Sequence, residues 1–359
     1  MAAFKRDQLP DALAQARAIV QTEVAPFVPG LSVTVAIDGA TVWSEGFGWS
    51  DLANKIAVTP ATRFRIGSVS KSLTAAGLAL LVERNKLDLD AGIQTCLPDF
   101  PEKEGKITPR LLAGHLAGIR NYRGREAASN LPYPNLRSGL KIFEDDPLES
   151  PPATKFSYAS YNYNILGAVM EAAAQENFLA FMEQNVIGPL GLGHTRPDHA
   201  GAVDPDLGRF YETWLNGNFI PSPAVNLSYA WPSGGYLSTA EDLVRFGNAH
   251  LRPGFLKLPS LKLLFTSQTT HNGKPTRYGM GWFVGRDIVY HGGDSFGGAA
   301  ILLLRPASRT VVAITANGGM GLLQNAIRRG RVPKEAKKFL FDKAAIAHRL
   351  AKVFAPLFK

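Results

Sequence analysis

The sequence predicts an α+β fold, and the order of the expected elements carries that prediction. Alternating apolar residues predict strands near the N-terminus, and strand patterns return over residues 278–315. Helices and long loops are expected between them. The strands from the two ends should join in one antiparallel sheet flanked by helices, with the mainly helical middle as an insertion. We therefore predict one module over residues 1–359, with an α/β subdomain (1–89 and 276–359) and a helical subdomain (90–275).

The first elements follow from their periodicity. Residues 8–27 have the pattern of an amphipathic helix that ends before Pro29-Gly30. Residues 31–37 alternate apolar with small or polar side chains, which predicts a strand. Asp38-Gly39 predicts a tight turn, and residues 42–49 are expected to form a second strand that runs back along the first. This pattern is typical of a β-hairpin.

The next element is an uncharged helix over residues 72–82, which is expected to lie in the core and is too short to span a bilayer. Ser68 and Lys71 precede it three residues apart, so they share one helix face. Ser68 or Ser70 could simply cap the helix, but a capping box needs Glu or Gln where Lys71 stands. A lysine beside a buried helix should have a lowered pKa and accept a proton from a nearby hydroxyl.

Helices are also predicted over residues 108–116, after residue 160 and over residues 239–251. The polar stretch 121–152 is expected to be a long surface excursion. This stretch and the loop 203–232 should decide the substrate. The closing strands are expected over residues 278–284, 288–291, 299–304 and 310–315.

Composition excludes several classes of protein. A chain of 359 residues with 45% hydrophobic residues can bury a large core. The single cysteine, Cys96, excludes an internal disulfide, and the histidines show no metal-ligand spacing. No glycine-rich phosphate loop is present, so we predict neither a metal nor a cofactor. The N-terminus lacks a secretory signal, so a cytoplasmic location is expected, with a removed leader left open.

The net charge of +9 is concentrated at the C-terminus, where residues 324–359 carry ten Lys and Arg against two acids. No nucleic-acid-binding motif accompanies this charge, so no nucleic-acid partner is predicted. Apolar residues among these cations (Phe339, Leu340, Ile346, Leu350, Phe354 and Leu357) would allow the helix to contact an anionic membrane. We favour a C-terminal helix, residues 334–358, that packs on the sheet with its cations in water.

Several motifs resemble one family when they are taken together in chain order. Residues 64–74 (Phe-Arg-Ile-Gly-Ser-Val-Ser-Lys-Ser-Leu-Thr) are similar to the nucleophile segment of the serine β-lactamase and penicillin-binding-protein superfamily. The match is closest to its class C-like serine hydrolases, family VIII esterases and LACTB-type proteins. Further similar segments are residues 111–119, 189–192, 234–243 and 278–282. The resemblance spans residues 30–317 and implies a β-lactamase/transpeptidase-like fold.

The resemblance implies a role for each matching residue. Ser68 would be the acylated nucleophile and Lys71 its proton acceptor. The Tyr-x-Asn motif falls on Tyr158 and Ser160, so Tyr158 would relay the proton, while Ser160 replaces the asparagine that helps bind substrate. An enzyme of this kind would hydrolyse small esters, amides or β-lactams through an acyl-enzyme.

The third motif of the family, often His-x-Gly in this branch, falls on His291, Gly292 and Gly293. His291 would hydrogen-bond near Tyr158 or the substrate. The resemblance also places the backbone N–H groups of Ser68 and Asp294 around the oxyanion. The changes at positions 160 and 291 argue against a dedicated β-lactamase and fit esterases and peptidases.

Other interpretations stay open at this stage. A non-catalytic binding or assembly protein on the same scaffold would have been supported by loss of Lys71 or Tyr158, yet both are present. Ser138 and Lys141 repeat the Ser-x-x-Lys spacing in a polar stretch, which we attribute to chance. The sequence predicts no oligomeric state.

Residues 293–297 fit Gly-x-Ser-x-Gly, the nucleophile elbow of α/β-hydrolases, with Asp342 and His348 following in chain order. Such an elbow joins a strand to a helix. Ser295 is instead followed by the apolar residues 299–304, which have the pattern of a strand. We therefore do not favour Ser295 as the nucleophile.

Overall fold

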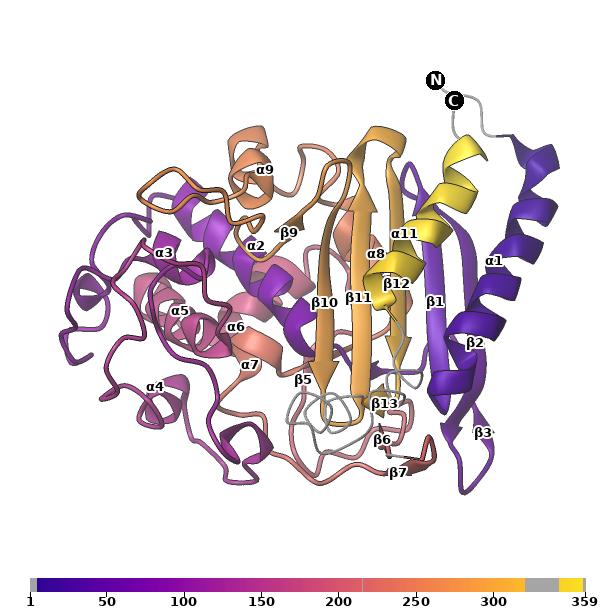
Figure 1. Ribbon diagram of the computed structural model, residues 1–359, viewed down its shortest axis with the longest axis horizontal. Coiled ribbons are helices and arrows are strands. Elements are labelled where there is room, and N and C mark those ends of the chain that lie inside the picture. Colours follow the sequence, from indigo (N-terminus) through magenta and orange to yellow (C-terminus); the bar gives the residue numbers. More distant parts are fainter. Residues whose placement is uncertain (1–4, 215, 320–341, 358–359) are drawn as a thin grey trace.

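A seven-stranded antiparallel sheet forms the centre of the computed structural model, which describes residues 5–214, 216–319 and 342–357 (Figure 1). Its strand order is β3-β2-β1-β12-β11-β10-β9. The strands are β1 (Gly30–Ile37), β2 (Ala40–Asp51), β3 (Ile56–Ala57), β9 (Phe283–Val284), β10 (Val289–Ser295), β11 (Gly298–Arg305) and β12 (Thr310–Ala316). β1 pairs with β12, with Leu31 opposite Ala316. The predicted joining of the N- and C-terminal strands is therefore confirmed.

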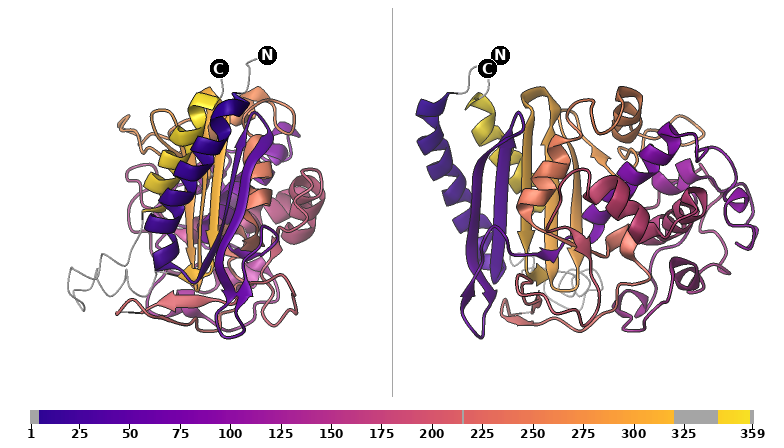
Figure 2. Two further views of the ribbon diagram at one scale, coloured as in Figure 1. Left: turned by 90° about the vertical axis from the view of Figure 1, so that its right-hand side faces the viewer. Right: turned by 180° about the vertical axis from the view of Figure 1, so that it is seen from behind.

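Alternation along the strands divides the molecule into two cores. Val33 and Val35 of β1 and Val312 of β12 are buried against helices α1 (Leu9–Glu23) and α11 (Lys343–Phe354). Figure 2 shows these two helices together on one face of the sheet. The opposite face of β12 packs against α8 (Ala240–Asn248) within the larger core. This arrangement follows from the two-residue period of a strand.

The larger core also joins the sheet to the helical part, which lies beside β10 (Figure 1). Here α2 (Ser70–Glu83) packs among α3 (Pro109–Ala113), α4 (Leu136–Leu140), α5 (Ser160–Ala174), α6 (Phe178–Met182), α7 (Trp231–Gly234) and α9 (Leu258–Phe265). Two small sheets consist of β4 (Phe64–Arg65), β8 (Tyr236–Ser238) and β5 (Arg196–Pro197), and of β13 (Gly318–Gly319), β6 (Tyr211–Thr213) and β7 (Phe219–Pro221). The subdomain boundaries remain predictions. Helix α8 lies within residues 90–275 yet covers the sheet.

The strand predicted over residues 278–284 is wrong in its extent, because only β9 forms there. Gly281 interrupts the extended backbone with a φ of +78°. A Cβ at this position would lie 2.6 Å from the Ala75 Cβ and 2.9 Å from the Lys71 carbonyl oxygen. The chain turns here because it passes directly over α2, which holds the candidate site.

Two expectations for the helical part also need correction. The helix predicted over residues 108–116 ends at Ala113, and His115 adopts a left-handed backbone with a φ of 56°. The stretch 121–152 does not lie wholly on the surface, because it contains α4 and buries Leu140 and Phe143. Its polar composition concealed these core residues.

The apolar side of α11 packs on the sheet, as favoured from the sequence. Ile346, Leu350 and Phe354 are buried, and the ring of Phe354 stacks on Trp43 with the centroids 6.1 Å apart. The earlier part of the predicted helix, residues 334–341, and residue 358 lie outside the described residues. No helix in the described ranges is both long enough and apolar enough to cross a membrane.

Candidate active site

The candidate nucleophile lies in a 3₁₀ turn, Gly67–Val69, that leads directly into α2 beside strand β10. Val69 occupies the N-cap position and no side chain caps the helix, so neither Ser68 nor Ser70 has the capping role. Gly67 has a φ of +49°, and a Cβ there would lie 2.6 Å from the Asp294 carbonyl oxygen. Only a glycine allows the turn to touch the strand in this way. Ser68 remains partly exposed.

Lys71 is fully buried one helical turn after Ser68. Its Nζ lies 3.0 Å from Ser68 Oγ, 3.2 Å from Ser160 Oγ and 2.6 Å from the Ser233 carbonyl oxygen. Burial lowers the pKa of the Lys71 amine to about 7. Within the described residues no carboxylate lies close enough to form an ion pair with it.

The three contacts of Lys71 match the number of hydrogen bonds that a neutral amine can make. Such an amine has two N–H donors and one lone pair. The Ser233 carbonyl oxygen can only accept a hydrogen bond, and Ser160 Oγ can also accept one. The lone pair is then left for the Ser68 hydroxyl. In this state Lys71 is placed to accept the Ser68 proton.

Tyr158 is the third group that the structure brings to this point, from the segment that leads into α5. Ser68 lies near enough to its hydroxyl to lower its pKa, and the Lys71 Nζ lies 5.1 Å from the centroid of its ring. Burial raises the pKa of Tyr158 well above its ordinary value, and the nearby Ser68 offsets only part of this shift. Tyr158 is therefore a neutral phenol near neutral pH, able to donate a proton and be reprotonated.

His291, on β10, is buried, with 1% of its surface exposed. Its Nδ1 lies 2.7 Å from the Gly292 carbonyl oxygen, so Nδ1 carries the proton, and Nε2 accepts from the Tyr278 hydroxyl at 3.0 Å. Burial, with the nearby Lys71, lowers the pKa of His291 to about 3.

His291 was expected to hydrogen-bond near Tyr158 or the substrate, and its partner Tyr278 packs against Tyr158 with the ring centroids 6.2 Å apart. The ring centroids of His291 and Tyr158 are 6.1 Å apart, and both ring nitrogens of His291 already have other partners. The physical reason is burial, since a neutral histidine in the core needs its donor and its acceptor satisfied locally. His291 therefore orients Tyr278 and strand β10.

Main-chain amides of two segments meet beside Ser68. A Cβ on Gly293 would lie 1.8 Å from the Ile66 carbonyl oxygen and 3.0 Å from the Ser68 nitrogen. A Cβ on Gly67 would lie 2.8 Å from the Asp294 nitrogen. The backbone nitrogens of Ser68 and Asp294 thus lie at one junction, where the family resemblance places an oxyanion hole.

A pocket of about 80 Å³ opens at this junction. It is lined by Ser68, Tyr122, Ala127, Ser160, Leu227, Tyr229, Ala230, Ser233, Gly234, Asp294, Ser295 and Phe296. Both loops expected to decide the substrate contribute to the lining. Ser160 and Asp294 line the pocket, and Gly293 allows β10 to approach the turn. Gly292 is absent from the lining, and a Cβ there would meet only Ile301 and Ala300 at ordinary contact distance.

Sequence reasoning assigned no role to two residues of the site. His115 is buried with its ring 4.3 Å from that of Tyr158, and its Nδ1 accepts from the Ala159 N–H and the Asn162 amide. It therefore fixes the orientation of Tyr158. The position of His115 in the family-like segment 111–119 could have indicated its importance. Tyr122 lies in no such motif.

The competing serines do not have the required surroundings. Ser295 ends β10 and is joined to β11 by a turn at Gly297, which has a φ of +67°, so a hairpin stands where an elbow needs a helix. Ser138 donates its hydroxyl to the Asn135 carbonyl oxygen at 2.7 Å, and Lys141 is exposed. The second Ser-x-x-Lys spacing therefore forms no buried pair.

Comparison with known proteins agrees with this geometry. The human serine beta-lactamase-like protein LACTB, mitochondrial, is 29% identical over 377 residues, with 77% of this chain and 69% of that protein covered. EstCE1, a hydrolase with promiscuous acyltransferase activity, has a TM-score of 0.75 at 19% identity, covering 87% of this chain and 94% of its own. The D-amino acid amidase from Ochrobactrum anthropi SV3, complexed with L-phenylalanine, has a TM-score of 0.75 at 21% identity, with coverage of 90% and 99%. These two solved structures share the fold. The family model described as Beta-lactamase matches residues 16–332, and the chain therefore belongs to the beta-lactamase family.

Proposed function

We propose that this chain is a serine hydrolase that acts on small esters or amides through an acyl-enzyme on Ser68. The observation that carries the proposal is the buried Lys71 amine, 3.0 Å from Ser68 Oγ, with its pKa lowered to about 7 by burial. A general base works best when its pKa lies near the working pH. Membership of a family of serine hydrolases supports the same reaction.

In the acylation step, Ser68 Oγ attacks the substrate carbonyl carbon and its proton passes to Lys71, directly or through Tyr158. The carbonyl π electrons move to the oxygen, which the N–H groups of Ser68 and Asp294 stabilise. The intermediate collapses with cleavage of the bond to the leaving group. Tyr158 gives the departing alkoxide or amine its proton, and the protonated Lys71 returns a proton to Tyr158.

Deacylation reverses these roles with water as the nucleophile. Lys71, neutral again, receives a proton from the attacking water, and the acyl–oxygen bond to Ser68 breaks. The proton returns to Ser68 Oγ and the acid leaves. Each group thus ends in its starting state, as turnover requires.

The substrate preference follows from the positions where the chain departs from the β-lactamase motifs. Ser160 stands where an asparagine would bind an antibiotic amide, and His291 is buried against Tyr278. We propose that esters and D-amino-acid amides are turned over faster than β-lactams. The similarity of the fold to EstCE1 and to a D-amino acid amidase supports this order.

The test compares wild type, Ser68→Ala and Ser295→Ala. Intact mass is measured after treatment with a fluorophosphonate probe, alongside turnover of p-nitrophenyl butyrate and nitrocefin. Loss of labelling only in Ser68→Ala supports the proposal, and the turnover ratio ranks esterase against β-lactamase activity. Labelling lost only in Ser295→Ala would mean that the wrong serine had been assigned. No labelling and no turnover in wild type would favour a binding or assembly role.

A further inference from the structure

The aromatic wall of the pocket includes a side chain that the reaction itself does not use. Tyr122 lines the pocket with Ser68 and packs edge-on against Tyr161, with ring centroids 4.8 Å apart, and against Tyr229 at 6.3 Å. The pocket has a volume of only about 80 Å³. One aromatic ring therefore controls much of the space available to an acyl chain.

Tyr122 lies beside the groups that contact the catalytic amine. It lines the same pocket as Ser160 and Ser233, both of which contact Lys71. The packing of its ring on Tyr161 and Tyr229 holds Tyr122 on the same pocket as the nucleophile.

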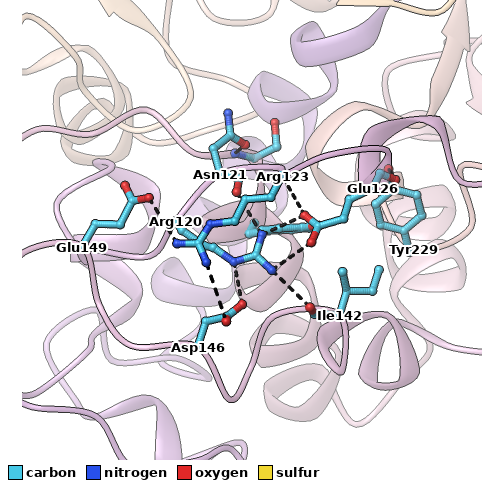
Figure 3. Close-up of polar contacts among 10 residues, drawn as sticks. Arg120, Asn121, Arg123, Glu126, Ile142, Asp146, Glu149 and Tyr229 are labelled. Carbon is cyan, nitrogen blue, oxygen red and sulfur yellow. Dashed lines mark hydrogen bonds and ion pairs between the residues drawn. The ribbon is translucent and has the colours of Figure 1, made fainter.

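A cluster of charged side chains surrounds Arg120, two residues before Tyr122 in the sequence, and includes Glu126 and Asp146 (Figure 3). The side chain of Arg120 is 4% exposed. It donates to Glu126 at 2.7 Å, to Asp146 at 2.6 Å and to the Asn121 carbonyl oxygen at 3.0 Å. The ion pair between Arg120 and Glu126 therefore joins the two ends of the short segment 120–126, which contains Tyr122.

Glu126 ties this segment to the helix that bears Ser160. Its carboxylate also accepts from the Tyr161 hydroxyl at 2.8 Å and from the Arg123 N–H at 2.7 Å. Burial alone would raise the pKa of Glu126, but the hydrogen bonds from Arg120, Arg123 and Tyr161 outweigh it, so the pKa lies below its ordinary value. The side chain of Asn121 accepts from the Ser160 N–H at 3.0 Å, which joins the segment to α5 a second time.

An ion pair with a buried arginine, such as Arg120, contributes little net stability compared with apolar packing, and in some proteins such a pair fixes one conformation. We propose that Tyr122 contacts the acyl group of the substrate and restricts the pocket to short acyl chains, and that the Arg120–Glu126 pair holds it there. This inference rests on the proposed acyl-enzyme chemistry at Ser68. Tyr122 is the specificity-determining residue and Arg120 and Glu126 are positioning residues.

The experiment measures kcat/KM for p-nitrophenyl acetate, butyrate and octanoate. In Tyr122→Ala the octanoate-to-acetate ratio rises by about tenfold or more, because pocket contacts discriminate acyl chains by amounts of this order. Tyr122→Phe keeps the ring and leaves the ratio near that of wild type. Tyr133→Ala is the matched control. Tyr133 also packs against Tyr229, with centroids 5.5 Å apart, but is absent from the pocket lining.

Glu126→Gln tests the positioning role, because it keeps the shape of the side chain and removes its charge. The octanoate-to-acetate ratio rises in the same direction but less, while the rate of fluorophosphonate labelling at Ser68 stays close to that of wild type. A lowered melting temperature with an unchanged ratio would show a purely structural role and would overturn this part of the proposal.

The outcomes separate the two proposals. If wild type is labelled at Ser68 and hydrolyses esters, but Tyr122→Ala leaves the ratio unchanged, the assignment of Tyr122 is wrong and the hydrolase function stands. If wild type is neither labelled nor active on any ester, the hydrolase function fails first. A ratio that shifts equally in Tyr133→Ala would overturn the specific role of Tyr122.

Discussion

At the residue scale, the chemistry depends on keeping one amine uncharged. Lys71 shows how, since burial alone lowers its pKa from 10.5 to about 7 and its contacts are hydroxyl and carbonyl oxygens. The neighbouring titratable groups stay neutral. The pKa of His291 is lowered to about 3 and that of Tyr158 is raised well above its ordinary value. Of these three groups, Lys71 is therefore the one whose protonation state changes near neutral pH.

The pH dependence of ester hydrolysis follows from these directions. Lys71 is active when deprotonated, so kcat/KM should rise with pH by about tenfold per unit below pH 7 and level off above it. Tyr158 and His291 keep their protonation states through this range. The measurement is kcat/KM for p-nitrophenyl butyrate, corrected for spontaneous hydrolysis. A rise centred near the ordinary lysine pKa would contradict the role of Lys71 as base.

The same shift links stability to pH. In the folded state the pKa of Lys71 is about 7, against 10.5 when unfolded, so the unfolded chain binds more protons between these values. The free energy of unfolding of wild type should therefore rise with pH relative to Lys71→Met, by about 1.4 kcal/mol per unit above pH 7. Below pH 7 the difference should be constant.

Urea denaturation of wild type and Lys71→Met at pH 5 to 9 measures this difference. Lys352→Met is the matched control, because Lys352 is exposed on α11. A difference between wild type and Lys71→Met that does not change with pH would show that Lys71 is already protonated throughout.

At the element scale, the site depends on contacts between segments that lie far apart in the sequence. Lys343, at the start of α11, donates to the Gly293 carbonyl oxygen at 3.0 Å and contacts the Asp294 carboxylate. These residues belong to the part of β10 that touches the turn of Ser68. The C-terminal helix thus reaches the strand that bears a proposed oxyanion donor.

Lys343→Met should lower kcat with little change in KM, because a loosened donor acts mainly in the transition state. A decrease of about tenfold is expected, less than the ~10²-fold typical of losing a donor outright. Lys343→Arg should restore most of the rate. Steady-state kinetics on p-nitrophenyl butyrate provide the measurement. An increase in KM at constant kcat would instead indicate a contact with substrate.

The elements that sequence reasoning predicted well are those with strong local patterns. The hairpin β1–β2 and the buried helix α2 follow from alternation and from an uncharged run. The early end of α3 and the break at Gly281 depend on tertiary contacts, which no local pattern records. Ser68, Lys71 and Tyr158 were found by motif and are close together in the structure. Tyr122 was missed because its proposed role depends on contacts that exist only in the folded chain, such as its ring packing on Tyr161.

At the scale of the whole molecule, the sheet separates a purely structural core from the one that bears the site. The core under α1 and α11 holds Phe354 and Trp43, whereas α2 belongs to the larger core. Stability and catalysis are therefore expected to respond to different substitutions.

Phe354→Ala should lower the free energy of unfolding by about 3–5 kcal/mol, the usual cost of emptying a buried aromatic site. Its kcat/KM for p-nitrophenyl butyrate should stay near wild type at temperatures below the unfolding transition. Thermal unfolding and kinetics on the same preparation provide the measurement. An unchanged melting temperature together with weaker binding to anionic vesicles would instead support the membrane alternative for this helix.

The glycine contact between β10 and the turn of Ser68 has a consequence for how such a protein can diverge. Both proposed oxyanion donors are main-chain amides, and Gly67 and Gly293 leave no space for a side chain between them. Substitution of side chains therefore cannot change these two hydrogen-bond donors in small steps. Substitutions that change the substrate are therefore expected in the loops around the pocket. The two main-chain amides, and with them the reaction, stay the same.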